Sequence, residues 1–275
     1  ISGSRSYDST TTADSSILTI TSGVSGESLS LTGAGILGAA SAGTQTITNN
    51  NTLAIADGTG SANNYTLNGA SINVTVIPKT LNVTLAREYD GTTTVAGALL
   101  APTFDSLQGG ETLAISGTGS VANANVGSSK AVTLGTIALA AGSGNPSNYS
   151  LNSVLLNVTQ RVINLDGIRA YDATTNVLSS DINTFGNIVS GETLTISGTG
   201  SVATNSVEMN KAISLGTLSL GNGSGAAGNY TLAGGTHTFD ISPVAVNITG
   251  SRQYDGTNVI AVSYTHLTLP TSTHG

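Results

Sequence analysis

Carboxylates recur along this sequence at fixed intervals, and a pair of carboxylates is the minimum requirement for hydrolysing a glycosidic bond. Asp90 and Glu111 lie in one segment, and Asp172 and Glu192 occupy the same places in the next. Acid–base hydrolysis needs the two carboxyl groups about 5 to 10 Å apart in a cleft. Small repeated domains rarely supply such a cleft, and an enzyme does not need its site copied in every repeat. We therefore predict a protein without enzymatic activity or catalytic residues.

The sequence does not support catalysis or metal binding by histidine or cysteine either. The chain contains no cysteine, which excludes thiol nucleophiles, disulfides and cysteine-based zinc sites. Of its three histidines only His237 lies in the repeated part, which is too few for a catalytic triad or a histidine metal site. The acidic residues are dispersed and form no Asp-x-Asp-x-Asp calcium loop. We predict no metal and no cofactor.

Two lysines raise the possibility of a covalent cross-link. Lys130 follows Glu111 by 19 residues, and Lys211 follows Glu192 by the same interval. An internal amide bond between lysine and asparagine, promoted by a buried acid, is one interpretation of this spacing. The simpler one is an exposed lysine, which is the usual state of that residue. Gln45 replaces the lysine in the first segment, so the segment does not require it.

Tyrosine is the other residue whose repetition suggests binding. The motif Arg-x-Tyr-Asp-Gly, or a near copy of it, occurs four times, and its successive tyrosines lie 82, 82 and 83 residues apart. Exposed Tyr and Asp could meet sugar hydroxyls, and Arg87 could stack on Tyr89 because residues two apart on a strand share a face. Alternatively, Tyr89 pins a strand-to-turn corner while Asp90 accepts hydrogen bonds from turn amides, the interpretation we favour. The motif residues are Arg5, Tyr7 and Asp8; Arg87, Tyr89, Asp90 and Gly91; Arg169, Tyr171 and Asp172; and Arg252, Tyr254, Asp255 and Gly256.

Two further motifs keep the same interval. A Gly-Glu pair and an Asn-Tyr pair each occur once between successive tyrosine motifs, and we predict that both are structural. A period this long and regular indicates a tandem array of one small domain. The pairs are Gly26 and Glu27, Gly110 and Glu111, and Gly191 and Glu192; and Asn64 and Tyr65, Asn148 and Tyr149, and Asn229 and Tyr230.

The elements that position these motifs are predicted to be strands. Apolar and polar residues alternate over 80–86, and similar short runs follow at 112–116, 130–135, 137–139, 149–151 and 154–158, separated by turn residues. About seven short strands per unit without a helical period predict an all-β chain of small antiparallel, immunoglobulin-like β-sandwiches. A β-solenoid is the alternative, although no sub-period of 20 to 30 residues divides the repeat. Short connections such as 77–79 should place the units end to end.

The period also predicts the domain boundaries. After Tyr254 the repeat stops, and 262–275 resembles translated sequencing-adapter read-through, with a divergent natural terminus as the alternative. We expect the chain to be an internal fragment of a longer protein. The predicted divisions are unit 1 at 1–78 with a truncated first strand, unit 2 at 79–160, unit 3 at 161–243, the start of a fourth unit at 244–261, and a non-native tail at 262–275.

Composition restricts the partners. Charged residues make up only 8% of the chain, and the formal net charge is −7. An acidic chain without a basic patch is a poor ligand for nucleic acid or for an anionic membrane. No run of about 18 apolar residues is present, so we expect no membrane insertion of this fragment.

Together these motifs resemble the tandem YDG repeats of large secreted bacterial proteins of the filamentous-haemagglutinin and adhesin type. The resemblance spans 4 to about 260 and is carried by 89–92, 110–113, 125–127 with Lys130, 148–151 and the joint at 78–79. Ser9 and Ala173 replace the motif glycine in two copies. The resemblance implies an extracellular or cell-surface location and a stalk or adhesive role.

We therefore expect a structural segment that projects a binding region of a bacterial adhesin. The alternative is a module that binds glycan or host protein through exposed repeat tyrosines. In either case a partner on a host or neighbouring cell would be met through the full-length protein. Burial of the repeat tyrosines would contradict the binding alternative.

Overall fold

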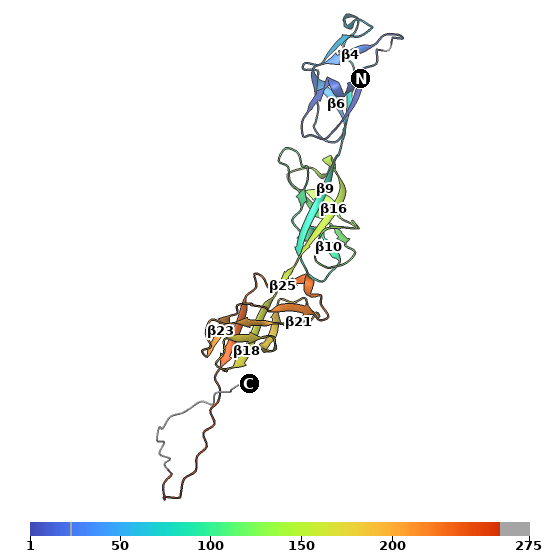
Figure 1. Cartoon of the computed structure of the whole chain (residues 1–275). Coiled ribbons are helices and arrows are strands. Elements are labelled where there is room, and N and C mark those ends of the chain that lie inside the picture. Colours follow the sequence, from blue (N-terminus) through green and yellow to red (C-terminus); the bar gives the residue numbers. More distant parts are fainter. Residues whose placement is uncertain (23, 259–275) are drawn as a thin grey trace.

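Three β-sheet units follow one another in an extended row (Figure 1). The computed structural model describes residues 1–22 and 24–258, so the predicted tail at 262–275 and residues 259–261 lie outside the described part. Within it, every strand pair lies inside one unit, and no helix is long and apolar enough to cross a membrane. The all-β prediction is confirmed. The solenoid alternative is wrong, because strands of successive units do not stack into continuous sheets.

The three units repeat one order of short strands and single 3₁₀ turns. Unit 1 comprises β1 Ser2–Ser6, β2 Thr12–Asp14, η1 Ser15–Ile17, β3 Leu18–Thr19, β4 Leu29–Thr32, β5 Ala34–Leu37, β6 Gly43–Asn49, β7 Ala54–Asp57, η2 Ala62–Asn64 and β8 Asn73–Ile77. Unit 2 comprises β9 Lys79–Glu88, β10 Thr94–Ala96, η3 Gly97–Leu99, β11 Thr103–Phe104, β12 Leu113–Ser116, β13 Thr118–Ser120, β14 Gly127–Ala131, β15 Ala138–Ala141, η4 Pro146–Asn148 and β16 Tyr149–Thr159. Unit 3 comprises β17 Arg161–Val162, β18 Asn164–Ala170, β19 Asn176–Leu178, η5 Ser179–Asp181, β20 Ile182–Gly186, β21 Leu194–Ser197, β22 Thr199–Ser201, β23 Glu208–Ala212, β24 Ser219–Asn222, η6 Ala227–Asn229, β25 Tyr230–Thr231 and β26 His237–Ser242.

The first and last strands of each unit pair in parallel at the centre of its main sheet. In unit 2, β9 and β16 pair from Lys79 opposite Tyr149 to Glu88 opposite Thr159. β1 pairs with β8 in the same way, and β17–β18 with β25–β26. The prediction of antiparallel sheets is therefore correct for the other pairs and wrong for this central one. A parallel pair places the entry and exit of the chain at opposite ends of the unit.

Each unit is a sandwich built around this pair. In unit 2 the main sheet has the order β11-β9-β16-β14, and the ribbons β10-β13 and β12-β15 form the other layer. Alternation along β9 buries Val83 and Leu85, and Leu156 of β16 joins them. Ile115 and Ile137 close the core from the second layer. The strand period read from the sequence thus assigns the inward face correctly.

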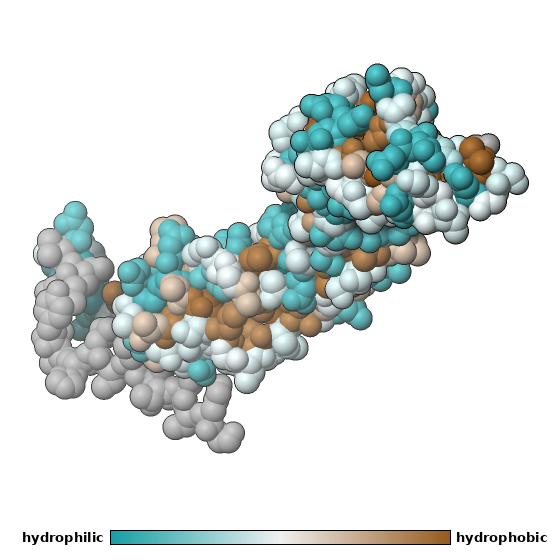
Figure 2. All heavy atoms as spheres, turned by 90° about the horizontal axis from the view of Figure 1, so that it is seen from above, coloured by the Kyte–Doolittle hydropathy of each residue, from teal (hydrophilic) through white to brown (hydrophobic). Residues whose placement is uncertain are grey.

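The surface is mostly hydrophilic or neutral. Figure 2 shows hydrophobic groups as separate patches among teal and white ones. Leu99, Met209 and Ile248 are among the large hydrophobic side chains that remain exposed. Scattered apolar side chains are usual on soluble domains, so these need no partner to explain them.

Close backbone packing requires several glycines in each unit, and one of them recurs at the same place in all three. A Cβ added at Gly198, whose φ is +92°, would lie 2.2 Å from the carbonyl oxygen of Thr217. Gly33 and Gly117 meet the carbonyl oxygens of Thr52 and Thr136 in the same way. These glycines join the two ribbons of the second layer, and backbone cannot move aside as a flexible side chain can.

We predict that Gly198→Ala destabilises unit 3 far more than Gly234→Ala does. Gly234 also has a positive φ, +83°, but an added Cβ would meet nothing within 4 Å. The control therefore carries only the left-handed penalty of about 1–2 kcal/mol, and Gly198→Ala adds roughly 1–3 kcal/mol of overpacking. Calorimetric unfolding of the full chain measures both. Equal losses would show that the contact with Thr217 relaxes freely.

Candidate functional site: the joints between units

Single residues connect the units. β8 ends at Ile77 and β9 begins at Lys79, so only Pro78 lies between units 1 and 2. Gln160 alone separates β16 from β17, and its side-chain amide donates to the carbonyl oxygens of Gly228 and Tyr230. Connections this short bring the end of one unit directly onto the start of the next.

The joint between units 1 and 2 is closed by a carboxylate held between two tyrosine hydroxyls. Tyr7 of unit 1 donates to Oε1 of Glu111 at 2.6 Å. Tyr149, from unit 2 itself, donates to Oε2 of the same carboxylate at 2.5 Å. Hydroxyl bonds to an ionised carboxylate are about twice as strong as neutral ones. The tyrosine motif of one unit and both other motifs of the next thus meet at one point.

The joint between units 2 and 3 repeats this arrangement. Tyr89 donates to Oε1 of Glu192 and Tyr230 donates to Oε2, both at 2.6 Å. Each bond from Tyr7 or Tyr89 spans 103 or 104 residues of sequence. The same three residue types therefore form both joints with the same atoms.

The tyrosine rings also pack on each other. Tyr7 and Tyr149 meet edge to face with ring centroids 5.3 Å apart, and Tyr89 and Tyr230 meet in the same way at 5.4 Å. Such pairs contribute about 0.5–1.5 kcal/mol beyond the area they bury. Leu113 of unit 2 belongs to the buried cluster of unit 1, so apolar packing continues across the joint.

The asparagine of the Asn-Tyr motif crosses the joint as well. Asn148 accepts a hydrogen bond from the backbone N–H of Ala42 at 2.9 Å, and Asn229 accepts one from Val126 at the same distance. Asn229 also donates to the side-chain oxygen of Asn125 at 3.0 Å. Asn148 and Asn229 are buried. A buried amide must find partners, and here the neighbouring unit supplies them.

A rigid corner presents each tyrosine. Asp90 accepts from the backbone N–H of Thr92 at 2.9 Å and pairs with Arg87 at 3.0 Å, which is the turn chemistry predicted for Asp90. Arg87 also donates to the carbonyl oxygen of Thr94 at 2.5 Å, so it braces the turn instead of stacking on Tyr89. The corners at Asp8, Asp172 and Asp255 accept from Thr10, Thr174 and Thr257 in the same way.

A glycine loop presents the glutamate. An added Cβ at Gly144 would lie 2.9 Å from Oε2 of Glu111, so only glycine leaves room for the side chain to lie across this loop. Ser143 ties the loop down, because its hydroxyl accepts from the backbone N–H of Thr112 at 2.9 Å. Gly225 and Ser224 repeat both contacts around Glu192 and Thr193.

Burial holds the joint tyrosines in their neutral form. It raises the pKa of Tyr149 to about 12, and the hydrogen bond to Glu111 acts in the same direction. The pKa values of Tyr7, Tyr89 and Tyr230 are raised by the same two causes, with burial the larger. A neutral hydroxyl can donate to the carboxylate, whereas a tyrosinate would repel it.

The model of one protein family matches the repeated part of the chain. The YDG domain is found at residues 77–155 and again at 157–238, which correspond to units 2 and 3. The chain belongs to the YDG domain family. Neither the curated proteins nor the solved structures contain a significant match to it.

The YDG motif residues lie where the structural interpretation places them, with one correction. Tyr89, Tyr149 and Tyr230 are buried, at 4%, 5% and 2% exposure, and Asp90 forms its turn. The hydroxyl of Tyr89, however, does not fasten its own corner but reaches Glu192 of the next unit. The motif residues Gly91, Gly110 and Gly191 all adopt a positive φ, as does Gly256.

The exceptions are Tyr65 of unit 1, which is only partly buried, and the tyrosines at the end of unit 3 and beyond it. Tyr171 is 37% exposed and Tyr254 is 94% exposed. Residues 243–258 carry no strand, although Arg252 pairs with Asp255 at 3.1 Å as in the other corners. The predicted start of a fourth YDG unit therefore stays a prediction.

The carboxylate pair considered for hydrolysis is divided between two joints. Glu111 binds Tyr7 and so faces unit 1. Asp90 belongs to the opposite corner, where an added Cβ at Gly91 would contact Val189 of unit 3. The two carboxyls of one YDG unit thus serve opposite ends of it. Among residues 1–22 and 24–258, no group of three or more His, Cys, Asp or Glu could hold a metal ion.

The lysines are bound, and away from these glutamates. The ammonium of Lys130 donates to the backbone oxygens of Asn123 and Asn125 and to the side chain of Asn123. Lys211 is buried and pairs with Glu208 at 2.8 Å. The expectation of an exposed lysine is wrong. The cross-link interpretation gains no support, because neither ammonium bonds to Glu111 or Glu192 and both carboxylates accept from the joint tyrosines.

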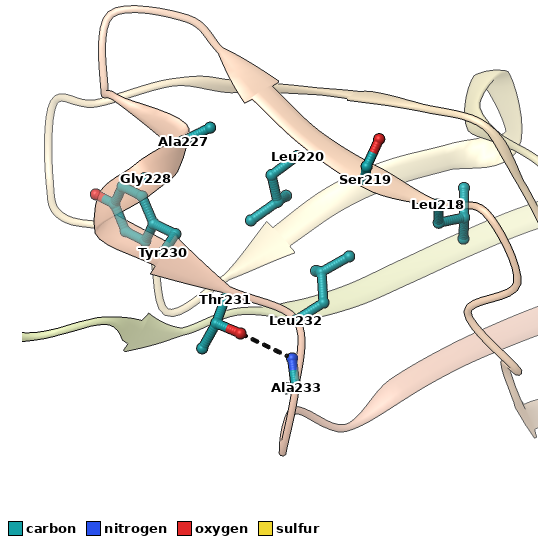
Figure 3. Close-up of a pocket in the computed structure, with 9 residues that line it drawn as sticks. All are labelled: Leu218, Ser219, Leu220, Ala227, Gly228, Tyr230, Thr231, Leu232 and Ala233. Carbon is teal, nitrogen blue, oxygen red and sulfur yellow. Dashed lines mark hydrogen bonds between the residues drawn. The ribbon is translucent and has the colours of Figure 1, made fainter.

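A small hollow lies beside the glutamate loop of unit 3 (Figure 3). Leu218, Leu220 and Leu232 line it between β24 and β25, and the backbone N–H of Ala233 donates to the hydroxyl of Thr231 at 3.1 Å. The corresponding hollow of unit 1 is lined by Leu53, Ile55 and Leu67 among others. No charged side chain lines either hollow, so neither offers a group to orient a charged ligand.

Sequence reasoning missed the residues that serve the joints without belonging to a motif. Gln160 and Arg161 are examples: Arg161 donates to the carbonyl oxygen of Tyr89 at 3.3 Å and to that of Asn187 at 2.6 Å. Gln160 occupies the place of Pro78 in the other joint, so the repeat gives no signal there. Ala42 contributes only its backbone N–H, which no residue type would reveal.

We predict that Tyr89→Phe loosens the joint between units 2 and 3 while leaving each unit folded. The substitution keeps the ring and removes a hydrogen bond to a carboxylate, worth about 1.5–3 kcal/mol. Spin labels at Leu99→Cys and Met209→Cys, both exposed, report the distance between the units by electron spin resonance. The distance distribution should broaden. The absence of native cysteine keeps the labelling specific.

Tyr171→Phe is the matched control for this measurement. It changes the same motif position, but its hydroxyl faces no described unit, so the distance between the labels should not change. An unchanged distribution in Tyr89→Phe as well would show that the carboxylate does not fix the joint.

Alkaline pH should open the joints before it unfolds the strands. A tyrosine whose pKa is raised in the closed joint ionises more readily in the open one, so closure is fully favoured below pH 10 and weakens above it. For Tyr149 the loss should extend to about pH 12. Tyrosinate absorbance and the inter-label distance should change together, while the circular dichroism of the strands persists. Broadening that begins near neutral pH would contradict this mechanism.

Proposed function

We propose that the chain is a non-enzymatic stalk segment of a secreted or surface-exposed bacterial adhesin, where it projects a binding region away from the cell. The observation that carries this proposal is the parallel pairing of the first and last strands of each unit. A stalk must pass tension along its length, and this pairing determines how tension enters and leaves a unit.

Tension on the chain ends loads this pairing in shear. β9 starts at the joint with unit 1 and β16 ends at the joint with unit 3, so a pull moves the two strands past each other. The ten paired positions between them then resist together. In a pair pulled apart from one end, the hydrogen bonds would break one after another. Shear therefore favours resistance to force, which a spacer without load would not need.

The joints suit the same role. The corner that carries Tyr89 directly follows β9, and the backbone N–H of Tyr89 donates to the carbonyl oxygen of Thr159 at the end of β16 at 2.9 Å. The contact with Glu192 thus begins where the force leaves unit 2. If each joint bends only a little, the length of the stalk increases with the number of units.

The surface location rests on composition and on the family resemblance. A chain with 8% charged residues, no cysteine and 35 glycines is typical of long extracellular bacterial repeats. A partner on a host or neighbouring cell would then be met by other parts of the full-length protein. For this segment we propose no nucleic-acid or membrane partner.

The tyrosine-platform alternative is less well supported. It requires exposed repeat tyrosines, yet Tyr7, Tyr89, Tyr149 and Tyr230 are packed inside the joints. Tyr171 is accessible, but it is the counterpart of Tyr89 and carries the same corner. Its exposure is more simply that of an unoccupied joint surface.

Single-molecule pulling on the ends of the chain tests the stalk proposal. Unfolding of one 82-residue unit should release about 25 nm, since an extended residue spans about 3.4 Å and the folded strand of ten residues about 33 Å. We expect three force peaks with this spacing.

Pulling unit 2 through Thr80→Cys and Ser150→Cys is the control. These two exposed positions face each other at one end of the parallel pair, so the strands unzip instead of shearing. The unfolding force should be clearly lower than in end-to-end pulling. Equal forces, or peaks absent from end-to-end pulling, would contradict the force-bearing role.

A further inference from the structure

The parallel strand pair of unit 3 is interrupted, whereas that of unit 2 is continuous apart from one bulge. β17 pairs with β25 and β18 with β26, and a loop at 232–236 separates β25 from β26. The last backbone bond before the loop runs from the N–H of Ile163 to the carbonyl oxygen of Thr231 at 2.9 Å. The next N–H on this side of the strand belongs to Leu165, and it meets the loop instead of a paired strand.

The ring of His237 bridges this interruption. Its Nδ1 accepts from the backbone N–H of Leu165 at 3.1 Å, and its Nε2 lies 2.9 Å from the carbonyl oxygen of Leu232, which Figure 3 labels at the start of the loop. A donor at Nδ1 and an acceptor at Nε2 admit one form of the ring, the neutral tautomer with its proton on Nε2. The side chain thus makes the connection that the loop takes from the backbone.

The equivalent position in the other two units is aliphatic. It lies five residues before the end of the last strand, where unit 1 has Ile72 and unit 2 has Val154. Both are 2% exposed, and His237 is 9% exposed. Unit 3 therefore carries a titratable ring at a core position that cannot be charged in units 1 and 2.

The charged groups of unit 3 around this ring have other partners. Two carboxylates on β18 and β26 lie on the opposite, outer face of the sheet, because neighbouring residues on a strand alternate between faces. The charged side chains on the inner face of these strands and of β23 are cations, and each pairs with a carboxylate. The groups are Asp166 and Asp240 on the outer face; Arg169 and Lys211 on the inner face, paired with Asp172 and Glu208; Asp181, which accepts from the N–H of Leu178; Glu192, which accepts from Tyr89 and Tyr230; and Arg161, which donates to Asn187.

We propose that His237 makes unit 3 acid-sensitive, because proton uptake by its ring breaks the bridge between β18 and the loop and destabilises this unit alone. An imidazolium ring donates at both nitrogens, so Nδ1 can no longer accept from Leu165. The N–H of Leu165 would then be a buried donor without a partner, which is unfavourable. The inference concerns the strands of one unit and does not depend on the stalk role.

The sign of the pH dependence follows from proton binding. A histidine in an unfolded chain takes up its proton near pH 6.5. Below that pH the unfolded unit binds a proton that the bridged ring of His237 excludes, so stability falls as the pH falls. Above about pH 7.5 both states carry the neutral ring, and the bridge contributes fully. Units 1 and 2 have no histidine and lack this dependence.

Labelling of a buried thiol in each unit of the full chain tests the proposal. Val177 of unit 3 and Val95 of unit 2 both lie six residues after their motif tyrosine, and both are 0% exposed. A cysteine at either position reacts with a pyridyl disulfide only when its unit opens. The chain has no native cysteine, so Val177→Cys and Val95→Cys each report one unit.

The measured quantity is the labelling rate of Val177→Cys divided by that of Val95→Cys. This ratio removes the pH dependence of the thiol itself, which is common to both variants. It should rise about thirtyfold from about pH 7.5 to about pH 5, the change expected for one proton that binds near pH 6.5 to the open unit only.

Two substitutions of His237 identify the ring as the cause. His237→Gln keeps a donor and an acceptor on one side chain but takes up no proton, so the ratio should stay the same at both pH values. His237→Val introduces the residue of unit 2 and removes the bridge, so the ratio should already be raised at neutral pH and should not rise further in acid. Circular dichroism shows whether each variant is folded, and His237→Gln decides the question if His237→Val is not.

A ratio that is equal at both pH values in the chain with His237 would overturn the proposal. So would an acid rise that persists in His237→Gln, because a carboxylate would then be the titrating group. Labelling is measured without load, so its outcome is independent of the force peaks that test the stalk proposal.

Discussion

The arrangement of this molecule depends on one interaction, a glutamate carboxylate held between tyrosine hydroxyls from two units. Without it each unit would still possess its sandwich core, since Val83, Leu85 and Leu156 are buried within unit 2. What the carboxylate adds is a defined orientation between neighbours. Its two oxygens accept from different units, so Glu111 can bind both hydroxyls only when unit 1 places Tyr7 beside Tyr149 of unit 2. Side-chain chemistry therefore determines the geometry that a one-residue connection alone would leave free.

The strand topology and the joint depend on each other. Parallel pairing of the first and last strands requires the chain to enter at one end of a unit and leave at the other, which places the tyrosine corner and the glutamate loop at opposite ends. An antiparallel central pair would return the chain to its starting end. The corner and the loop would then compete for the same surface, and a continuous row could not form. The topology thus produces a heterologous interface, in which one end of a unit contacts the opposite end of the next, and this interface joins the units into a row.

The sequence predicted the units better than it predicted their contacts. Alternation identified β9, and Asp90 with its turn was recognisable because turn chemistry is local. Strands β10, β11 and β13 have only two or three residues each, too few for a period to be visible. β16 was predicted as two segments because its register shifts between Leu151 and Ser153. The partner of Tyr89 could not be predicted at all: Glu111 and Glu192 are in phase, and a period cannot tell a contact within a unit from one with the next.

The departures from the glycine of the tyrosine motif follow from how the corner is held. Ser9 and Ala173 adopt φ values of 64° and 67°, close to the 75° of Gly91, so a side chain is accepted in the left-handed region at a strain of about 1–2 kcal/mol. The arginine–aspartate pair and the bonds to the following threonine maintain the turn against that strain. Space then decides the residue: an added Cβ at Gly91 would lie 2.9 Å from a methyl group of Val189, whereas Ser9 faces Gly109. At Gly91 the neighbour across the joint therefore restricts the residue to glycine, in addition to the preference of the left-handed turn.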